Sequence, residues 1–164
     1  GLGTSNVLAL PYVVSLSTSG TPAATLAAIN GTYTIFASTP AAAISGGSIS
    51  AIGTPDSASG AFNVNFSANT VGYSIAFPLA GQTFTLQGTA NFINNSPSGG
   101  DSRFLGGGTI TSSGSACSST CSGQIPFGPN IQGYITGTNG ERIGSNYAFT
   151  SAIGTVAGAV VAKP

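Results

Sequence analysis

This chain has very little charge and lacks several residue types. Of its 164 residues three are basic and three are acidic, and there is no His, Trp or Met. Soluble domains are ordinarily about a quarter charged, whereas the charged fraction here is 4%. The absence of His excludes Ser-His-Asp and Cys-His catalytic arrangements, and three basic residues cannot supply a patch that follows nucleic-acid phosphates. We therefore expect no enzyme activity and no binding of nucleic acid.

The few acidic residues do not indicate a metal or catalytic site. Asp56, Asp101 and Glu141 lie far apart in turn-like segments, so neither a carboxylate pair for acid-base catalysis nor a calcium cluster is predicted. Zinc would lack ligands because the chain has no His and only two Cys. We expect no cofactor. A nearly neutral surface also has little electrostatic repulsion between copies, which favours self-association.

The two cysteines, Cys117 and Cys121, predict a disulfide in preference to free thiols. Their Cys-x-x-x-Cys spacing differs from the Cys-x-x-Cys redox motif. A disulfide indicates an oxidising compartment. We expect an exported, extracellular or cell-surface protein whose signal peptide has been removed before Gly1. No apolar run reaches the length of a membrane-spanning helix.

Apolar residues recur with a period of two between turn signals, which predicts an all-β fold: a single antiparallel β-barrel of about eight strands over residues 18–164. One short helix is predicted from Thr21 to a stop at Asn30–Gly31. The strongest pattern is three consecutive strands between Ala61 and Phe92, joined by turns at Ala68–Asn69 and Ala80–Gly81. Further strands are predicted at Tyr33–Phe36, Ser48–Ile52, Phe104–Thr111, Ile131–Thr136, Tyr147–Ala152 and Val156–Ala162. Bulky residues are expected to fill the interior, namely Phe62, Phe66, Tyr73, Phe77, Phe84 and Leu86.

Residues 1–17 are predicted to form an N-terminal arm or strand. Apolar side chains occupy alternate positions at Leu8, Leu10, Tyr12, Val14 and Leu16. This pattern has two interpretations. The segment is the first strand of the barrel, or it is a donor strand that pairs with the sheet of a neighbouring copy. Head-to-tail exchange of such an arm produces open filaments unless it closes into a ring.

Several segments together resemble a known family. They are Val64–Phe77, Gly81–Gly88, Gly123–Asn130, Gly140–Phe149 and Val156–Lys163. Over roughly Thr32 to Lys163 the chain resembles the C-terminal β-barrel domain of proteobacterial surface proteins, a barrel shared by transferrin-binding-protein-B-like lipoproteins and the tails of some FecR-type envelope proteins. The resemblance implies an eight-stranded, up-and-down-like barrel on a Gram-negative surface.

Two functional hypotheses follow. In the first, the chain is a structural subunit of an extracellular filament or surface assembly, and its partner is another copy of itself through Leu8–Leu16. In the second, it is a monomeric secreted or surface barrel that binds a host protein or a small ligand. We expect no membrane insertion, because Trp is absent and the aromatic girdle pattern of outer-membrane barrels is weak. The many Ser and Thr residues are possible sites for glycans.

Overall fold

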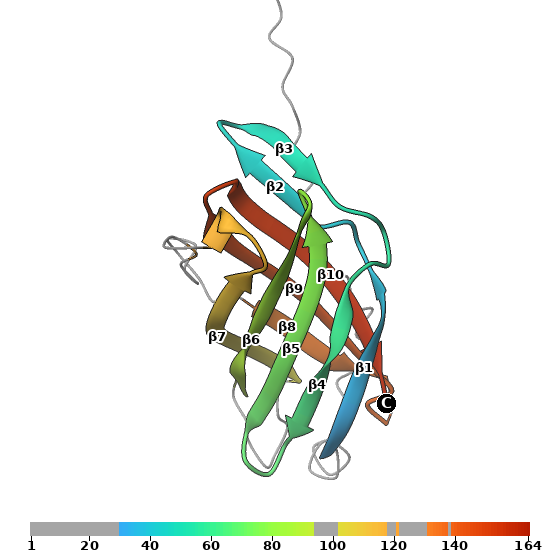
Figure 1. Cartoon of the computed structure of the whole chain (residues 1–164). Coiled ribbons are helices and arrows are strands. Elements are labelled where there is room, and N and C mark those ends of the chain that lie inside the picture. The colour runs from blue at the N-terminus through green and yellow to red at the C-terminus, as the bar shows by residue number, and fades with distance from the viewer. Residues whose placement is uncertain (1–29, 94–101, 118–120, 122–130, 138) are drawn as a thin grey trace, which may run out of the picture.

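The computed structural model describes residues 30–93, 102–117, 121, 131–137 and 139–164. These residues form ten strands and one turn of 3-10 helix (Figure 1). The strands are β1 (Asn30–Ser38), β2 (Ala42–Ser45), β3 (Ser48–Ile52), β4 (Ser59–Asn65), β5 (Thr70–Leu79), β6 (Gln82–Phe92), β7 (Arg103–Ser112), β8 (Ile131–Thr136), β9 (Arg142–Ser151) and β10 (Gly154–Lys163), and the helix is η1 (Ser115–Cys117). Each strand pairing is antiparallel, which confirms the predicted class.

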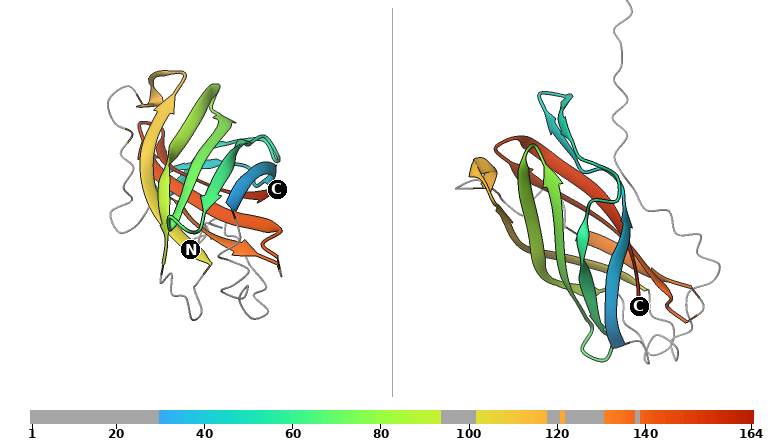
Figure 2. Two further views of the ribbon diagram at one scale, coloured as in Figure 1. Left: turned by 90° about the horizontal axis from the view of Figure 1, so that it is seen from below. Right: turned by 45° about the vertical axis from the view of Figure 1, so that its right-hand side comes forward.

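Eight of these strands close into a barrel. Their order is β1, β4, β5, β6, β7, β8, β9 and β10, and β10 pairs back with β1. The views in Figure 2 show this curved sheet from below and from the side. The prediction of a single barrel of about eight strands is therefore confirmed. All eight ring strands lie between Asn30 and Lys163, while the predicted arm of residues 1–17 lies outside the described residues.

The predicted helix stop at Asn30–Gly31 is wrong. Both residues begin β1, where Asn30 is paired with Asn65 and Gly31 with Val64 of β4. The Asn30 side chain accepts a hydrogen bond of 3.2 Å from the Phe66 backbone N–H. An Asn-Gly pair is favoured by turns and helix ends, but here the cross-strand ladder satisfies its backbone groups. The rest of the segment predicted to be helical lies outside the described residues.

Aromatic and branched side chains fill the barrel interior. Alternate residues of each strand face inward, as the burial pattern of β5 shows. The Phe77 ring stacks on Phe84 at 5.7 Å and on Tyr147 at 4.9 Å between centroids. The largest fully buried side chains are Phe62, Phe77, Phe84, Phe104, Phe149, Ile75, Leu79, Leu86, Ile131, Ile135 and Ile143. The six bulky residues predicted for the core are all buried, as expected for a small barrel.

Two predicted turns join the central strands β4, β5 and β6. Asn69, at the β4–β5 turn, adopts a left-handed φ of 59°, and its N–H donates to the Phe66 carbonyl. Ala80 and Gly81, at the β5–β6 turn, have φ values of 52° and 72°. Two consecutive left-handed residues in a two-residue loop form a type I′ hairpin turn, whose twist matches that of the flanking strands.

The other predicted strands agree with the structure in position, with two differences. Strand β9 begins at Arg142 rather than at the predicted Tyr147, because the pairing with β8 runs back as far as Thr136 and Arg142. Strand β2 was not predicted. Its sequence Ala-Ala-Ile-Ser has no alternation of large and polar side chains, so the period-two signal is missing there.

Strands β2 and β3 form a ribbon that projects beyond one end of the barrel (Figure 1). β1 pairs with the C-terminal part of β10 and β2 pairs with its N-terminal part. The chain between β1 and β2 stays beside β10, because Thr39 exchanges backbone and side-chain hydrogen bonds with Ala159. β3 then returns along β2, and β4 returns along β1.

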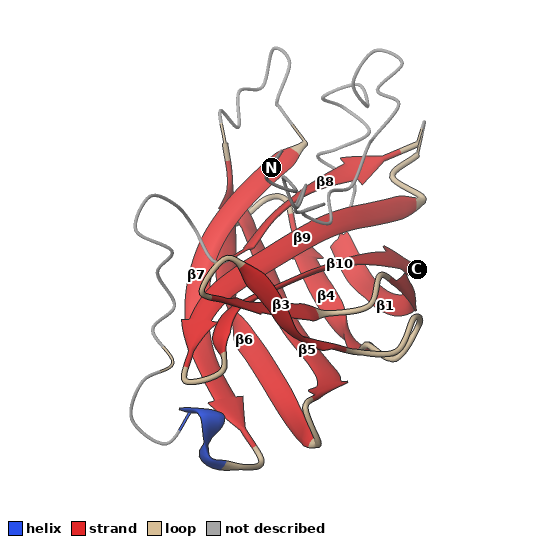
Figure 3. Ribbon diagram, turned by 90° about the horizontal axis from the view of Figure 1, so that it is seen from above, coloured by secondary structure: helices blue, strands red, loops and turns tan. Residues whose placement is uncertain are grey.

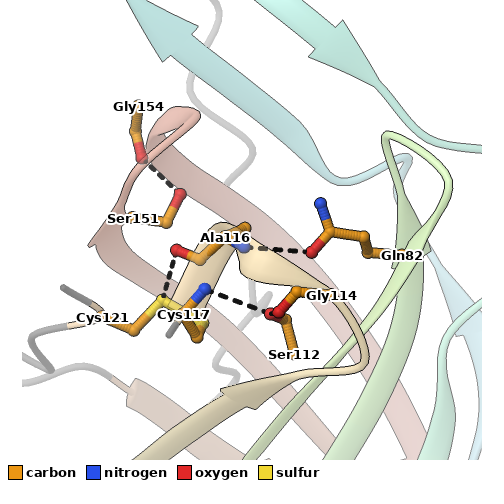
Figure 4. Close-up of a disulfide and its surroundings, with 8 residues drawn as sticks. All are labelled: Gln82, Ser112, Gly114, Ala116, Cys117, Cys121, Ser151 and Gly154. Atoms are coloured by element: carbon orange, nitrogen blue, oxygen red, sulfur yellow. Dashed lines mark hydrogen bonds between the residues drawn. A yellow bond between two sulfur atoms is a disulfide. The ribbon is translucent and has the colours of Figure 1, made fainter. Parts of the chain in front are cut away.

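The predicted disulfide is present, and it lies in a turn at one end of the barrel. Cys117 and Cys121 are bonded, with Cα atoms 4.7 Å apart (Figure 4). Within η1, the buried residue Ala116 accepts a hydrogen bond from the Ala152 N–H and donates its own N–H to the Gln82 side chain. Seen from above, η1 lies at the periphery of the strands (Figure 3). The disulfide therefore fixes a turn that links the β5–β6 hairpin to the β9–β10 hairpin.

Candidate functional site

The free edge of the projecting ribbon is the candidate functional site. In the described part of the chain, β3 is the last strand of the sheet and pairs only with β2. The eight ring strands each have a neighbour on both sides, because the barrel is closed, although the β8 ladder covers only Arg103–Gly106 of β7 and Arg142–Tyr147 of β9. An unpaired strand edge offers backbone donors and acceptors to another chain. Side chains fill the interior, so among the described residues the edge and the outer wall are the surfaces considered for a partner.

A β-bulge places two isoleucines on the same face of β3. Ile49 is opposite Ile44, and Ile52 is opposite Ala42, with a register shift between them. Residues three apart normally face opposite sides of a strand, but one extra residue restores the same side. Ile44 and Ala42 face outward, because Ala43 between them is fully buried. Ile49 and Ile52 are 58% and 66% exposed. We call Ala42, Ile44, Ile49 and Ile52 the ribbon patch.

The same isoleucines carry the backbone groups that point away from β2. The Gly46–Gly47 turn joins Ser45 and Ser48, and in two-residue hairpins this flanking pair is mutually hydrogen-bonded. The N–H of Ile49, the next residue, therefore points to the free edge. At the other end of β3 the Gly53 N–H donates to the Ala41 carbonyl at 2.7 Å. The alternation then directs the N–H of Ile52 outward as well.

The ribbon patch is continuous with the outer wall of the barrel. The register aligns Ile52 with Ala42, Ala42 with Ala157 of β10, and Ala157 with Ala148 of β9. This row of four residues on one outer face contains only apolar side chains, of which Ala157 is buried and the other three are at least partly exposed. The bulge itself is held in place, because Ser50 Oγ donates to the Ile153 carbonyl at 2.9 Å. An incoming strand would thus meet a preformed edge backed by an apolar surface.

The two acidic residues in the described part of the chain, Asp56 and Glu141, have separate hydrogen-bond partners. Asp56 accepts a hydrogen bond of 2.9 Å from the Ser38 N–H, and Glu141 accepts two from Asn139, at 3.2 and 3.3 Å. The Asp56 carboxylate thus connects its turn to the end of β1, the Glu141 carboxylate bonds within its own turn, and Asp101 lies outside the described residues. Within the described ranges there is no group of three or more His, Cys, Asp or Glu residues that could hold a metal ion.

The donor-strand residues predicted from the sequence lie outside the described residues, so this prediction stays open. They are Leu8, Leu10, Tyr12, Val14 and Leu16. Sequence reasoning predicted β3 as a strand but missed that it is an edge. The available signal was Ile49 and Ile52 on either side of Ser-Ala, a spacing of three in a strand bounded by Gly-Gly and Gly-Thr-Pro. In the part of the chain that is described, no helix is long and apolar enough to cross a membrane.

Comparisons with known proteins give one kind of match. No protein-family model and no curated protein matches the sequence. Among solved structures, the chain is similar to the N-lobe domain of lactoferrin binding protein B of Moraxella bovis, with a TM-score of 0.47 and 13% sequence identity. The match covers 81% of this chain, which spans 58% of the length of that structure. That structure is an N-lobe, so the resemblance to the C-terminal and FecR-type barrels stays a prediction.

Proposed function

We propose that this chain is a secreted or cell-surface β-barrel without catalytic activity that binds a protein partner at its β3 edge. The partner would add an extended, uncharged strand with one apolar face. The observation that carries the proposal is the combination of free backbone groups and exposed apolar side chains at Ile49 and Ile52. Strand addition uses main-chain hydrogen bonds for affinity and alternate side chains for specificity.

The interior supports a protein partner over a small ligand held inside the barrel. Phe62, Phe84, Phe104 and Phe149 are each fully buried, and their rings lie within about 6 Å of another ring, centroid to centroid. The outer wall bears no acidic or basic group on the row from Ala148 to Ile52. An uncharged strand would therefore leave no ion unpaired on binding. The disulfide supports an oxidising location.

A direct test measures backbone pairing at the edge. We would titrate the full chain with a synthetic peptide of alternating Val and Thr and follow amide hydrogen exchange. We expect added protection at Ile49 and Ile52. The control peptide carries N-methyl groups on its edge-facing amides and cannot form the ladder. Binding of either peptide without protection at these two amides would show that the peptide adsorbs without strand addition and would overturn the proposal.

Two charge variants sharpen this test. Ile52→Lys places a charge beside the edge, a device by which natural edge strands avoid pairing, and we expect peptide affinity to fall about tenfold, or roughly 1.4 kcal/mol. Thr89→Lys adds the same charge at an exposed position of β6, a strand paired on both sides. Thr89→Lys should leave the affinity unchanged. Equal losses in both variants would contradict an edge-specific site.

Assembly with another copy is the second candidate function. The predicted strand Leu8–Leu16 has the chemistry that the β3 edge would accept, because it is uncharged and its apolar residues alternate. In this case β3 is the acceptor and the arm of a neighbouring copy is the donor. The barrel ring would stay intact, since it closes through β1 and β10. This exchange therefore differs from one in which the donor fills a missing ring strand.

The length of the chain favours exchange between copies over pairing within one copy. Residues 17–29 connect Leu16 to the start of β1, and fully extended they span at most about 45–50 Å. An antiparallel arm centred on Ser50 would bring Leu16 level with Gly46, the ribbon tip. Between Asn30 and Gly46 the chain runs along β1 and β2 for roughly 50 Å. This path length is an upper bound on the distance to be spanned, so a connection within one copy would use most of the length available.

The same exchange experiment separates the two candidates. Protection of Ile49 and Ile52 that rises with protein concentration in the absence of peptide would identify a second copy as the partner. Sedimentation velocity on the same samples would then show oligomers, and Ile52→Lys should shift them towards monomer. Concentration-independent exchange in a monodisperse monomer would exclude self-assembly at this edge and leave a different protein as the partner.

A further inference from the structure

A second surface feature lies on β1, away from the ribbon tip, and is built around an exposed aromatic ring. Along the β1–β10 pairing, Ile35 is opposite Ala162 but Ala37 is opposite Val161. Phe36 between them is the extra residue of a β-bulge. Its side chain is 48% exposed. Bulges re-aim side chains and are over-represented at functional sites, so the position of this ring is a specific feature of the local backbone.

Two of the three basic side chains in the whole sequence meet at this ring. Arg142 Cζ lies 5.6 Å from the centroid of Phe36, and Lys163 Nζ lies 5.2 Å from it. The pairing of Ile143 with Ala162 places Arg142 and Lys163 at the adjoining ends of β9 and β10. Like charges on neighbouring strands repel each other. The ring attracts both cations and holds them at one place on the outer wall.

No carboxylate of the described residues neutralises these two cations. Arg142 Nη1 donates to the Glu141 backbone carbonyl at 2.7 Å, not to a carboxylate. The Glu141 carboxylate accepts instead from the Asn139 backbone N–H and side-chain amide. The chain as a whole has a formal net charge of zero. Arg142 and Lys163 are therefore two cations without a carboxylate partner among the described residues, on an otherwise weakly charged wall.

We propose that Phe36, Arg142 and Lys163 form a binding site for an oxyanion, a carboxylate or phosphate group carried by a ligand. A guanidinium offers paired donors that match the geometry of both groups, and an ammonium adds a compact charge. A bound oxyanion that contacts both cations would offset their mutual repulsion. The site is independent of the β3 edge and does not rest on the function proposed there.

The test uses the full chain and two probes, inorganic phosphate and an oligogalacturonate, at low ionic strength. We expect saturable NMR shifts centred on Phe36, Arg142 and Lys163. A neutral oligosaccharide of the same length serves as the control for the second probe. Preferential binding of phosphate or of the oligogalacturonate would identify the group that the site prefers. Shifts spread over the surface that do not saturate would show only nonspecific attraction and would overturn the proposal.

A relocated charge distinguishes a built site from net charge. Lys163→Gln should weaken binding at least fivefold. The double variant Lys163→Gln/Thr89→Lys restores the net charge at a distant exposed position and should stay equally weak. Phe36→Leu keeps an apolar side chain but removes the ring, and it should weaken binding several-fold. Unchanged affinity in Phe36→Leu, or full recovery in the double variant, would contradict the site. Thermal unfolding of each variant verifies that it is folded.

Discussion

The contact between Tyr147 and Gly158 provides a stringent test of how the barrel interior is packed. The two residues are directly opposite each other on β9 and β10. Tyr147 is 3% exposed, its ring stacks on Phe77, and its hydroxyl has no hydrogen-bond partner among the described residues. A Cβ built on Gly158 would collide with this hydroxyl and would lie 2.5 Å from Tyr147 Cζ. Glycine is therefore required because the tyrosine ring crosses its strand.

The magnitudes of two substitutions follow from this geometry. A buried polar group without a partner costs about 1–3 kcal/mol, so Tyr147→Phe should leave stability unchanged or raise it by up to about 1 kcal/mol. Gly158→Ala overpacks the interior, which typically costs about 1–3 kcal/mol. In the double variant the hydroxyl collision is gone but the Cζ contact remains. We therefore expect partial rescue, with a coupling energy of about 0.5–3 kcal/mol.

Urea denaturation of the four proteins of this cycle gives the free energies directly. A gain of 1 kcal/mol corresponds to a rise in melting temperature of about 2–4 °C for a domain of this size. A loss of more than about 1 kcal/mol in Tyr147→Phe would mean that the hydroxyl is hydrogen-bonded, for example to a buried water. A neutral Gly158→Ala would mean that the ring can move aside. Either result would refute the reasoning.

Two further predictions concern the disulfide and alkaline pH. Replacing Cys117 and Cys121 by Ser should lower the free energy of unfolding by about 2 kcal/mol, from the loop-closure entropy of so short a loop, and urea denaturation with and without reductant should give the same difference. Burial raises the pKa of Tyr73 to about 12, and burial followed by the Glu141 charge raises that of Tyr33. An unfolded tyrosine ionises near pH 10. The stability that comes from keeping these buried hydroxyls protonated is therefore fully present below about pH 10 and is lost as pH rises towards about 12. The urea midpoint should fall over this interval, and Tyr73→Phe should reduce the fall; a midpoint independent of pH there would contradict the buried position of these hydroxyls.

The sequence predicted strands and their inward faces wherever one face of a strand is buried and the other is exposed to solvent. In β5 the large residues Val71, Tyr73, Ile75, Phe77 and Leu79 alternate with smaller ones, and all five are buried. The period of two and the face toward the core are then the same signal. The hairpin turns were equally readable, because left-handed backbone conformations favour Asn and Gly.

Of the ribbon, the strand β3 was predicted with its bounds, but β2 and the free edge were not, for the opposite reason. In β2 the inward residue, Ala43, is no larger than its outward neighbour Ala42, so burial leaves no pattern in side-chain size. In β3 the bulge changes the period, and Ile49 and Ile52 appear at a spacing of three. Whether a strand is an edge depends on where its neighbours end. This is a property of the assembled sheet and is not written in β3 itself.

The proposed binding site at Phe36 could not be predicted from the sequence either. Phe36, Arg142 and Lys163 are far apart in the sequence, and the spacing around each gives no motif. Closure of the ring joins β1 to β10, and β10 in turn pairs with β9. Only this register brings the three side chains together. A chain with six charged residues in total has few ways to mark a polar site, so the meeting of two of them at one ring is informative.

The closed barrel and the low charge together limit where this protein can interact. Ring closure leaves β3 as the terminal strand of the described sheet. Natural proteins protect such edges with charge, bulges or short length, and β3 has a bulge and only five residues but no charged side chain. The bulge also directs Ile49 and Ile52 to one face, so it adds an apolar surface at the edge that it interrupts. If the edge bound no partner, a polar residue at Ile49 or Ile52 would leave the stability of the fold unchanged. The variant Ile49→Thr tests this point. If the partner strand still protects the Ile52 amide from hydrogen exchange in this variant, the backbone edge accepts the strand without the apolar face.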